Sequence, residues 1–204
     1  MTTPREFAKR TLDVLVSSIA LVMLSPLLML LAIAIRFDSP GAVLFCQKRS
    51  CRGGSAFTLY KFRTMIENAP DYRNADGSTF NAPGDARVTR LGHFLRSTSL
   101  DELPQLFNIL TGAMSLVGPR PDLVDQSQFY APDEWRRLLV KPGITGLAQT
   151  SGRNSICWAE RKQFDLEYVA SQSLLLDLKI VLRTVPCVLG SRDIHINQVS
   201  EEIR

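Results

Sequence analysis

The sequence has 204 residues, 45% of them hydrophobic, and a formal net charge of +4. This length is enough for one domain with a buried core. The charge is uneven, because residues 1–63 hold nine Lys and Arg against three Asp and Glu. Such an excess beside an apolar segment indicates an anionic membrane surface or phosphate ligands, and the absence of a nucleic-acid recognition motif argues against nucleic acid. The four cysteines have no metal-site spacing and are expected to be free thiols in a reducing compartment.

The first predicted element is an apolar segment, residues 14–35, whose 22 positions contain no charged side chain. As a helix it would be about 33 Å long, enough to cross a bilayer. Ser25 and Pro26 lie at its middle, so we expect the helix to break or kink there. Basic residues, which prefer the cytoplasmic side of a membrane, occur on both flanks: Arg5, Lys9 and Arg10 before the segment, and Arg36, Lys48, Arg49 and Arg52 after it.

We therefore predict that residues 1–36 form a re-entrant anchor, which enters the membrane, turns at Ser25-Pro26 and returns to the cytoplasmic side. A kinked single span is the alternative. A secretory signal peptide is not expected, because the apolar run is too long and no small-x-small cleavage site follows it.

Residues 42–64 are predicted to form a β-hairpin around a Gly53-Gly54 turn. Its second strand continues through Lys61 and Arg63, which alternate with apolar residues. These two cations could lie on a solvated face or could bind a phosphate. Residues 67–86 are rich in Pro, Gly, Asp and Asn, and they are predicted to be a loop that serves as a flexible lid or is disordered.

The C-terminal part contains three further predicted helices, at residues 132–139, 158–169 and 174–189, the last interrupted by Pro186. One face of this last helix carries an apolar stripe: Leu174, Leu175, Leu178, Val181, Leu182, Val185, Val188 and Leu189. Such a stripe is more typical of a core, although a helix lying at a membrane interface is an alternative. Residues 191–204 are expected to be a polar tail.

The most informative pattern occupies residues 99–121. A helix with one buried face, ending at Gly112, is predicted from the spacing of Leu103, Leu106, Phe107 and Leu110. Asp101 and Glu102 would then lie in or beside its first turn, where backbone N–H groups favour negative charge. The simplest interpretation is structural, because Ser99-x-x-Glu102 has the spacing of a capping box.

The neighbouring arginines favour a chemical interpretation of the same pair. Arg96 precedes it, and Arg120 follows between two prolines that restrict the backbone. A rigid guanidinium fork is suited to phosphate. A carboxylate pair beside fixed arginines is what Mg²⁺-assisted phosphoryl transfer requires, with one carboxylate on the metal and the other as nucleophile or base.

With these residues in place, the whole chain resembles the bacterial sugar transferases, the monotopic phosphoglycosyl transferases, in a minimal form. The resemblance rests on several motifs in order: Lys9-Arg10-x-x-Asp13, Ser25-Pro26, Tyr60-Lys61-Phe62-Arg63-Thr64-Met65, Arg96-x-x-Ser99-Leu100-Asp101-Glu102-Leu103-Pro104-Gln105-Leu106, Gly118-Pro119-Arg120-Pro121, Lys141-Pro142-Gly143-Ile144-Thr145-Gly146 and Gly152-Arg153-Asn154.

The resemblance implies a UDP-sugar donor, a polyprenyl (undecaprenyl) phosphate acceptor, Mg²⁺, and UMP as product, at the cytoplasmic face of the bacterial inner membrane. It implies that Asp101 is the nucleophile, through a covalent phospho-sugar intermediate, and that Glu102 binds the metal. The phosphate-binding positions it implies are Lys61, Arg96, Arg120 and Arg153, to which the alternation in the predicted hairpin adds Arg63. The product would be a sugar diphospholipid that starts a glycan or exopolysaccharide.

Two positions depart from the family pattern. Ala113 stands where the family usually has Asp, and Cys51 stands where a Gln-x-Arg-x-Gly pattern has its glycine. We expect these changes to affect local geometry and sugar preference rather than the chemistry.

The expected fold is α+β and mainly helical: a re-entrant helix-break-helix, a small β-hairpin, and amphipathic interfacial helices around a site at the membrane surface. The expected units are the anchor at 1–36, a cytoplasmic catalytic domain at 37–190 and the tail at 191–204. Two other functions are open: a membrane-anchored Mg²⁺-dependent phosphohydrolase, and a non-catalytic peripheral membrane protein in which Asp101-Glu102 only caps a helix.

Overall fold

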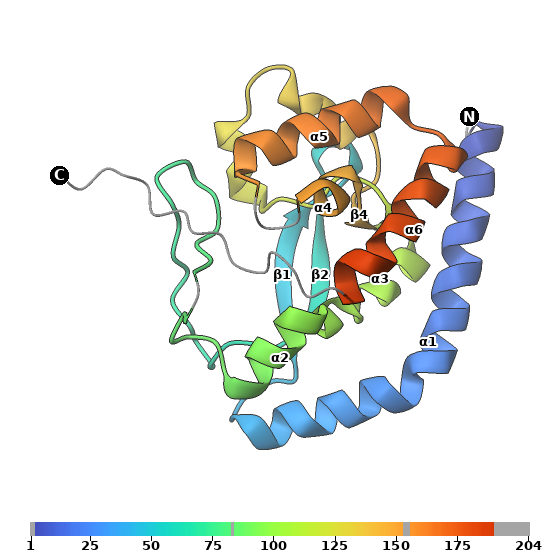
Figure 1. Ribbon diagram of the computed structural model, residues 1–204. Coiled ribbons are helices and arrows are strands. Elements are labelled where there is room, and N and C mark those ends of the chain that lie inside the picture. Colours follow the sequence, from blue (N-terminus) through green and yellow to red (C-terminus); the bar gives the residue numbers. More distant parts are fainter. Residues whose placement is uncertain (1–2, 83, 153–155, 190–204) are drawn as a thin grey trace.

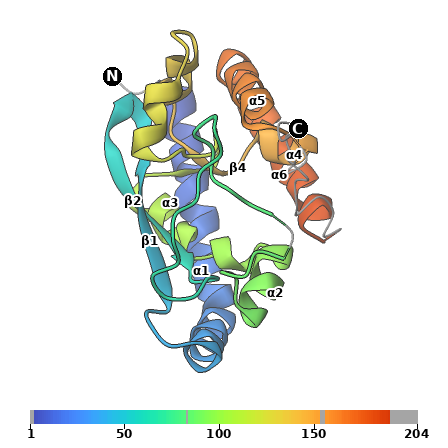
Figure 2. The same cartoon turned by 90° about the vertical axis from the view of Figure 1, so that its left-hand side faces the viewer.

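The structure, a computed structural model, describes residues 3–82, 84–152 and 156–189. These residues form a mainly helical fold with one antiparallel hairpin and a second, parallel pair of short strands (Figure 1). The hairpin lies at one side of the molecule and the helices α5 and α6 at the other (Figure 2). The expected tail at 191–204 lies outside the described residues.

The elements follow one another in this order, with η for a short 3₁₀ helix: α1 (Pro4–Asp38), β1 (Leu44–Ser50), η1 (Arg52–Gly54), β2 (Ala56–Phe62), α2 (Arg90–Thr98), η2 (Leu100–Glu102), α3 (Gln105–Thr111), β3 (Ser115–Val117), η3 (Val124–Phe129), η4 (Glu134–Leu139), β4 (Gly143–Thr145), α4 (Leu147–Gly152), α5 (Trp158–Ser171) and α6 (Leu174–Leu189).

Helix α1 begins with a capping box between Thr3 and Glu6 and continues unbroken through Pro26. It bends near its middle, so that its second half passes beneath the rest of the molecule (Figure 1). Pro26 has no N–H to donate to the carbonyl four residues earlier, and the Ser25 hydroxyl donates to that carbonyl, Val22 O, at 2.8 Å. The predicted helix-break-helix is thus one continuous, bent helix, because Ser25 supplies the missing donor.

Polar contacts tie the first half of α1 to the rest of the chain. Lys9 forms a 2.6 Å ion pair with Asp177 of α6 and donates to Val117 O. Arg10 donates to the carbonyls of Ile109 and Leu110, at the C-terminal end of α3. Carbonyls in the last turn of a helix lack the usual donor four residues on, and a cation there also complements the helix dipole. Ile109 O accepts from the capping Gly112 N at 3.0 Å as well. The Lys9-Arg10 pair therefore joins α1 to α3, β3 and α6.

The core has three clusters, and both halves of α1 contribute to it. Leu31 and Ile35 pack with Phe62 and Leu95, while Ala20, Leu21 and Leu24 line the second cluster. The buried residues of the other two clusters are Leu59, Leu106, Ile109 and Met114 in the second, and Val117, Leu147, Tyr168 and Ile180 in the third. The outer face of α1 stays exposed, and α1 is the helix, within the described residues, that is long and apolar enough to cross a membrane.

The hairpin confirms the sequence prediction. β1 pairs antiparallel with β2, with Leu44 opposite Phe62 and Ser50 opposite Ala56, and η1 makes the turn at the two glycines. The Asn108 side chain of α3 extends this hairpin by accepting from Tyr60 N at 3.0 Å and donating to Thr58 O at 2.8 Å. The hairpin and the helix after the acidic pair are therefore one rigid unit.

The motif Lys141–Gly146 is structural. Its strand β4 pairs in parallel with β3, Ser115 opposite Gly143 and Val117 opposite Thr145. Gly143 N donates to Pro119 O at 2.9 Å, and a Cβ at position 143 would come within 2.1 Å of Gly118 N. Only glycine allows this approach, which holds the backbone just before Arg120.

The helix predicted after Pro132 is present as the 3₁₀ helix η4. Two other predictions about the helices are wrong: Pro186 lies inside α6 without interrupting it, and the buried face of α3 differs from the predicted one. In α3 the side chain of Phe107 is 49% exposed, and the polar Gln105 and Asn108 take the buried positions. Asn108 is buried because the edge of β2 satisfies its amide.

The apolar stripe of α6 does not form core. Leu175 and Leu182 are each 63% exposed, and Leu178 and Val185 are more than half exposed. The helix packs inward through Ile180 and through Asp177, which accepts from Tyr168 Oη at 2.7 Å. The interfacial alternative is therefore the one that this exposure favours.

Candidate active site

The acidic pair lies in a tight corner between two helices. Helix α2 ends at Thr98, Ser99 takes a left-handed conformation (φ 57°), and η2 follows with Asp101 and Glu102 before α3 begins at Gln105. A non-glycine residue with positive φ is uncommon and is typical of functional sites. The pair is therefore in a 3₁₀ turn just before α3, and not in the first turn of a longer helix.

The predicted capping box is absent. The Ser99 side chain does not cap η2, and the Glu102 carboxylate points to other partners. Glu102 Oε1 accepts from Lys61 Nζ at 2.7 Å and from Arg120 Nη2 at 2.9 Å. A capping box requires the Glu102 carboxylate to accept from the Ser99 backbone N–H. The carboxylate instead links Lys61 of the hairpin to Arg120, in the segment after β3.

The charges around Glu102 fix its ionisation. Burial opposes the ionised form, but Arg120 and Lys61 outweigh it and hold the pKa of Glu102 well below its usual range. Glu102 in turn raises the pKa of Arg120, against the effect of burial. Glu102 is therefore ionised at neutral pH, as a carboxylate that holds a cation must be.

Asp101 lies beside this cluster in a different environment. Asp101 is 8% exposed, and no side chain or backbone group of the described residues donates a hydrogen bond to its carboxylate. Burial raises the pKa of Asp101, Lys61 lowers it, and the charge of Glu102 raises it further. Two adjacent carboxylates thus have pKa values pushed in opposite directions, which is typical of groups with different chemical roles.

Of the predicted cations, the structure brings Lys61, Arg96 and Arg120 to the acidic pair. Arg96 lies in the last turn of α2 and donates to Thr64 Oγ1 at 2.9 Å; burial lowers its pKa and Asp101 opposes this. Arg120 follows β3 directly, in the rigid Pro119–Pro121 segment. These three cations come from three separate parts of the chain.

Arg63 is not brought to the site. Its guanidinium donates to Ser39 O at 2.8 Å and to Pro40 O, just after the end of α1. It closes the C-terminal end of α1, and nothing in its contacts supports a ligand-binding role. Arg153 lies outside the described residues.

Two cations near the site were missed by the sequence analysis. Burial and the charge of Arg120 lower the pKa of Arg49 to about 10, and its guanidinium donates to Pro121 O at 3.3 Å. Burial and Arg120 also lower the pKa of Arg161, in the first turns of α5. The signal for Arg49 was the Gln-x-Arg pattern in β1, whose arginine we did not assign.

The acidic pair could supply some, but not all, of the ligands of a magnesium ion. Mg²⁺ commonly takes one or two carboxylates together with substrate phosphates and water. Glu102 is ionised, and both of its ion pairs use Oε1, which leaves Oε2 outside these contacts. Among the described residues there is no cluster of three or more metal-binding side chains, so a metal here would depend on substrate oxygens.

Comparison with known proteins gives the family. The profile described as bacterial sugar transferase matches residues 4–191. The chain belongs to the bacterial sugar transferase family.

Three relatives show how closely the chain resembles named members. The uncharacterized sugar transferase EpsL of Bacillus subtilis is 44% identical over 196 residues, covering 95% of this chain and 94% of that protein. The exopolysaccharide production protein ExoY of Rhizobium meliloti is 42% identical over 196 residues, with 91% and 87% covered. The UDP-glucose:undecaprenyl-phosphate glucose-1-phosphate transferase of Caulobacter vibrioides is 43% identical over 194 residues, with 90% and 70% covered.

The two departures from the family pattern lie against each other in this sugar transferase. The Cys51 thiol donates to Ala113 O at 3.1 Å, between the hairpin turn and the segment before β3. The atoms nearest to a Cβ at Gly112, next to Ala113, belong to Arg10 and Lys141. Basic side chains therefore border the backbone just before Ala113.

Proposed function

We propose that this protein transfers sugar-1-phosphate from a UDP-sugar to undecaprenyl phosphate and releases UMP. The observation that carries the proposal is the acidic pair: Glu102 is held by Lys61 and Arg120, while Asp101 is left without a hydrogen bond from the described residues. Membership of a family whose named members include undecaprenyl-phosphate sugar phosphotransferases supports the substrate classes.

In the first step, an oxygen of the Asp101 carboxylate attacks the phosphorus that carries the sugar. The new bond joins Asp101 to that phosphorus, and the bond from it to the bridging oxygen of UMP breaks, so that UMP leaves with the electron pair. Lys61 and Arg120, which Glu102 orients, stabilise the negative charge on the diphosphate as it shifts to UMP. The raised pKa of Asp101 indicates a carboxylate poorly solvated by water, which favours attack.

In the second step, an oxygen of the lipid phosphate attacks the same phosphorus. The bond to Asp101 breaks, the carboxylate is regenerated, and the sugar remains on the lipid as a diphosphate. Mg²⁺, for which Glu102 is the expected ligand, would neutralise charge on the diphosphate oxygens when bound. The burial of Asp101 limits access of water to the intermediate, which favours transfer over hydrolysis.

A screen of UDP-sugars tests the function. Purified protein with undecaprenyl phosphate and Mg²⁺ should release UMP from at least one UDP-sugar and form a lipid-linked sugar diphosphate. Free sugar phosphate with UMP and no lipid product would indicate a hydrolase instead. UMP release that is unchanged in Asp101→Asn would show that the acidic pair is structural.

We further propose that α1 is a re-entrant anchor at the cytoplasmic face of the inner membrane. Both halves of α1 contact the same domain, through Lys9 and Arg10 at one end and Leu31 and Ile35 at the other. A straight span would carry one end across about 30 Å of hydrocarbon and away from these contacts. The exposed stripe of α6 supports an interfacial position for that helix as well.

Cysteine labelling tests this topology. In a variant without native cysteines, Thr2→Cys and Ser39→Cys should both be protected from an impermeant reagent in intact cells, and both should react after permeabilisation. Replacing Ser25 and Pro26 with leucine should straighten the helix and favour a full span. Labelling of Thr2→Cys alone in intact cells with the native Ser25-Pro26 would establish a single span and refute the re-entrant arrangement.

A further inference from the structure

The segment that carries Arg120 is held by backbone contacts on two sides. Arg49 of β1 donates to Pro121 O at 3.3 Å, and Ser50 N donates to Asp122 O at 2.9 Å. From the opposite side, Arg137 of η4 donates to Arg120 O at 3.3 Å. Successive carbonyls of residues 120, 121 and 122 thus each accept a hydrogen bond from a different donor.

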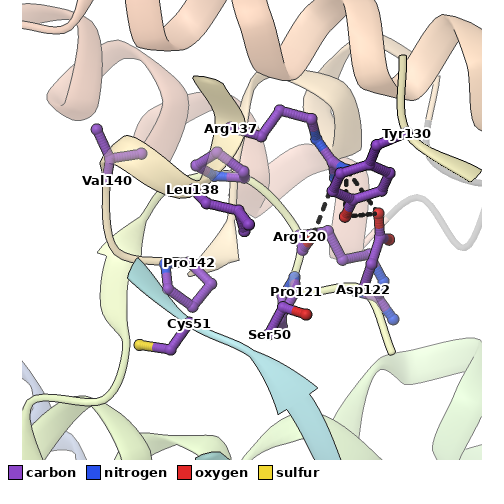
Figure 3. Close-up of a pocket in the computed structure, with 11 residues that line it drawn as sticks. Ser50, Cys51, Arg120, Pro121, Asp122, Tyr130, Arg137, Leu138, Val140 and Pro142 are labelled. Carbon is purple, nitrogen blue, oxygen red and sulfur yellow. Dashed lines mark hydrogen bonds and ion pairs between the residues drawn. The ribbon is translucent and has the colours of Figure 1, made fainter. Parts of the chain in front are cut away.

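Arg137 is the more deeply buried of the two arginines, and its fork is fully occupied. It is 2% exposed, and its Nε and Nη2 donate to Asp165 Oδ2 at 3.0 and 2.6 Å. Its Nη1 donates to Asp122 Oδ2 at 2.5 Å. Figure 3 shows Arg137 reaching Asp122 and the Arg120 carbonyl together. One planar guanidinium therefore joins η4, α5 and the segment after Arg120, which a lysine cannot do.

The carboxylate of Asp122 is the second fixed point. Besides Arg137, its Oδ2 accepts from Tyr130 Oη at 2.7 Å and from Trp158 Nε1 at 3.3 Å. Asp122 is 6% exposed, and these three donors fix the carboxylate in place. Because Asp122 lies two residues after Arg120, with only Pro121 between them, a shift of Asp122 moves Arg120.

We propose that Arg137 is a positioning residue for the transfer reaction: it holds Arg120 in the place from which its guanidinium binds Glu102. The proposal rests on the proposed function for its kinetic part. Among the described residues, Arg137 reaches the acidic pair through Arg120, whose Nη2 is 2.9 Å from Glu102 Oε1. A misplacement of about 1 Å far from the chemistry can cost about a hundredfold in rate. Arg137 therefore acts on kcat without touching substrate.

The test variant is Arg137→Lys, because removing the charge would leave two buried carboxylates unpaired and would endanger folding. The control is Glu134→Gln, which weakens the other buried ion pair between η4 and α5, Lys162 to Glu134 at 2.7 Å, and keeps Lys162 over the Trp158 ring. Arg137→Lys should lower kcat about a hundredfold with a much smaller change in KM. Glu134→Gln should keep the wild-type kcat even if it lowers the melting temperature. An equal loss of kcat in both variants would assign the effect to η4–α5 packing and overturn the proposal.

A double-mutant cycle with Arg120→Lys tests the route of the effect. If Arg137 works through Arg120, then Arg137→Lys has little further effect on kcat once Arg120 is changed. Multiplicative losses would overturn the proposal. If Arg137→Lys does not fold, a second variant, Tyr130→Phe, removes the hydroxyl that donates to Asp122 and accepts from Arg137, and it keeps every charge. It should still lower kcat severalfold; a wild-type kcat in that folded variant would overturn the proposal.

Hydrogen–deuterium exchange of residues 118–123 separates this proposal from the proposed function. Exchange should be faster in Arg137→Lys and unchanged in Glu134→Gln, whether or not UMP is released. Unchanged exchange in Arg137→Lys would overturn the positioning role. A wild-type protein that releases no UMP but shows the expected exchange pattern would refute the proposed function and leave the positioning role intact.

Discussion

Replacing Glu102 with glutamine isolates the charge that holds the two cations of the site. The change keeps the size of the side chain but removes the negative charge that Lys61 at 2.7 Å and Arg120 at 2.9 Å share, so that two cations are left beside a neutral amide oxygen. Removing the charge of one partner of a buried ion pair costs about 3–5 kcal/mol, because the opposite charge stays buried without compensation. The side chains of Lys61, Glu102 and Arg120 are 16%, 18% and 34% exposed, so water screens part of this cost.

The expected loss of unfolding free energy is therefore about 3 kcal/mol, the low end for breaking a buried pair. The same loss in the transition state would lower turnover by about a hundredfold. Because Glu102 is also the expected metal ligand, the Mg²⁺ concentration at half-maximal UMP release should rise, and excess Mg²⁺ should partly restore the rate.

The assays are urea denaturation and UMP release titrated with Mg²⁺. The matched control is Glu134→Gln, which makes the same change in a buried pair with Lys162 at 2.7 Å, away from the site. The control should lose comparable stability and keep turnover and the Mg²⁺ dependence. If Glu102→Gln unfolds at the wild-type urea concentration and keeps the wild-type rate, Glu102 does not hold these cations in solution and the reasoning fails.

Three further changes have defined outcomes. Arg120→Lys loses the planar fork and should cost about 1.5–3 kcal/mol, or about tenfold to a hundredfold in kcat/KM; wild-type kinetics would make Arg120 structural. Lys61→Met removes a charge that lowers the pKa of Asp101, so the acidic limb of kcat/KM, where Asp101 becomes protonated, should shift to higher pH; an unmoved limb would exclude Asp101 as the titrating group. Asp13→Ala removes the acceptor for Leu116 N at 2.9 Å and should lower the unfolding free energy by about 1–3 kcal/mol, measured by denaturation.

The sequence was enough to single out the acidic pair and its partners. Asp101, Glu102 and Arg120 were singled out because two adjacent carboxylates near a proline-flanked arginine are seldom needed for structure alone. Their meeting with Lys61 could not be derived from periodicity, because it depends on how the hairpin packs on α3. That packing uses the Asn108 amide, a long-range contact that no local pattern reports.

Two of the wrong predictions, the α6 stripe and Phe107, have a common physical cause. Apolar spacing shows which side chains share a face of a helix, and it does not show what covers that face. The α6 stripe and Phe107 therefore read as core although they are exposed. The alternation in the predicted second strand placed Arg63 on the same strand face as Lys61, which suggested a phosphate ligand. Its guanidinium instead donates to backbone carbonyls at the end of α1. At Ser25-Pro26, in contrast, local chemistry is sufficient: Pro26 leaves the Val22 carbonyl without its usual donor, and the neighbouring Ser25 hydroxyl donates to it.

The most direct test of the central claim is the covalent intermediate on Asp101. Protein mixed with a productive UDP-sugar and Mg²⁺, without lipid acceptor, should release up to one UMP per protein and gain the mass of one sugar phosphate on the peptide that contains Asp101. Asp101→Asn should show neither the burst nor the added mass, while Glu102→Gln should show both slowly. UMP release that requires the lipid acceptor, with no mass added to the wild-type protein, would contradict the account and establish direct transfer instead.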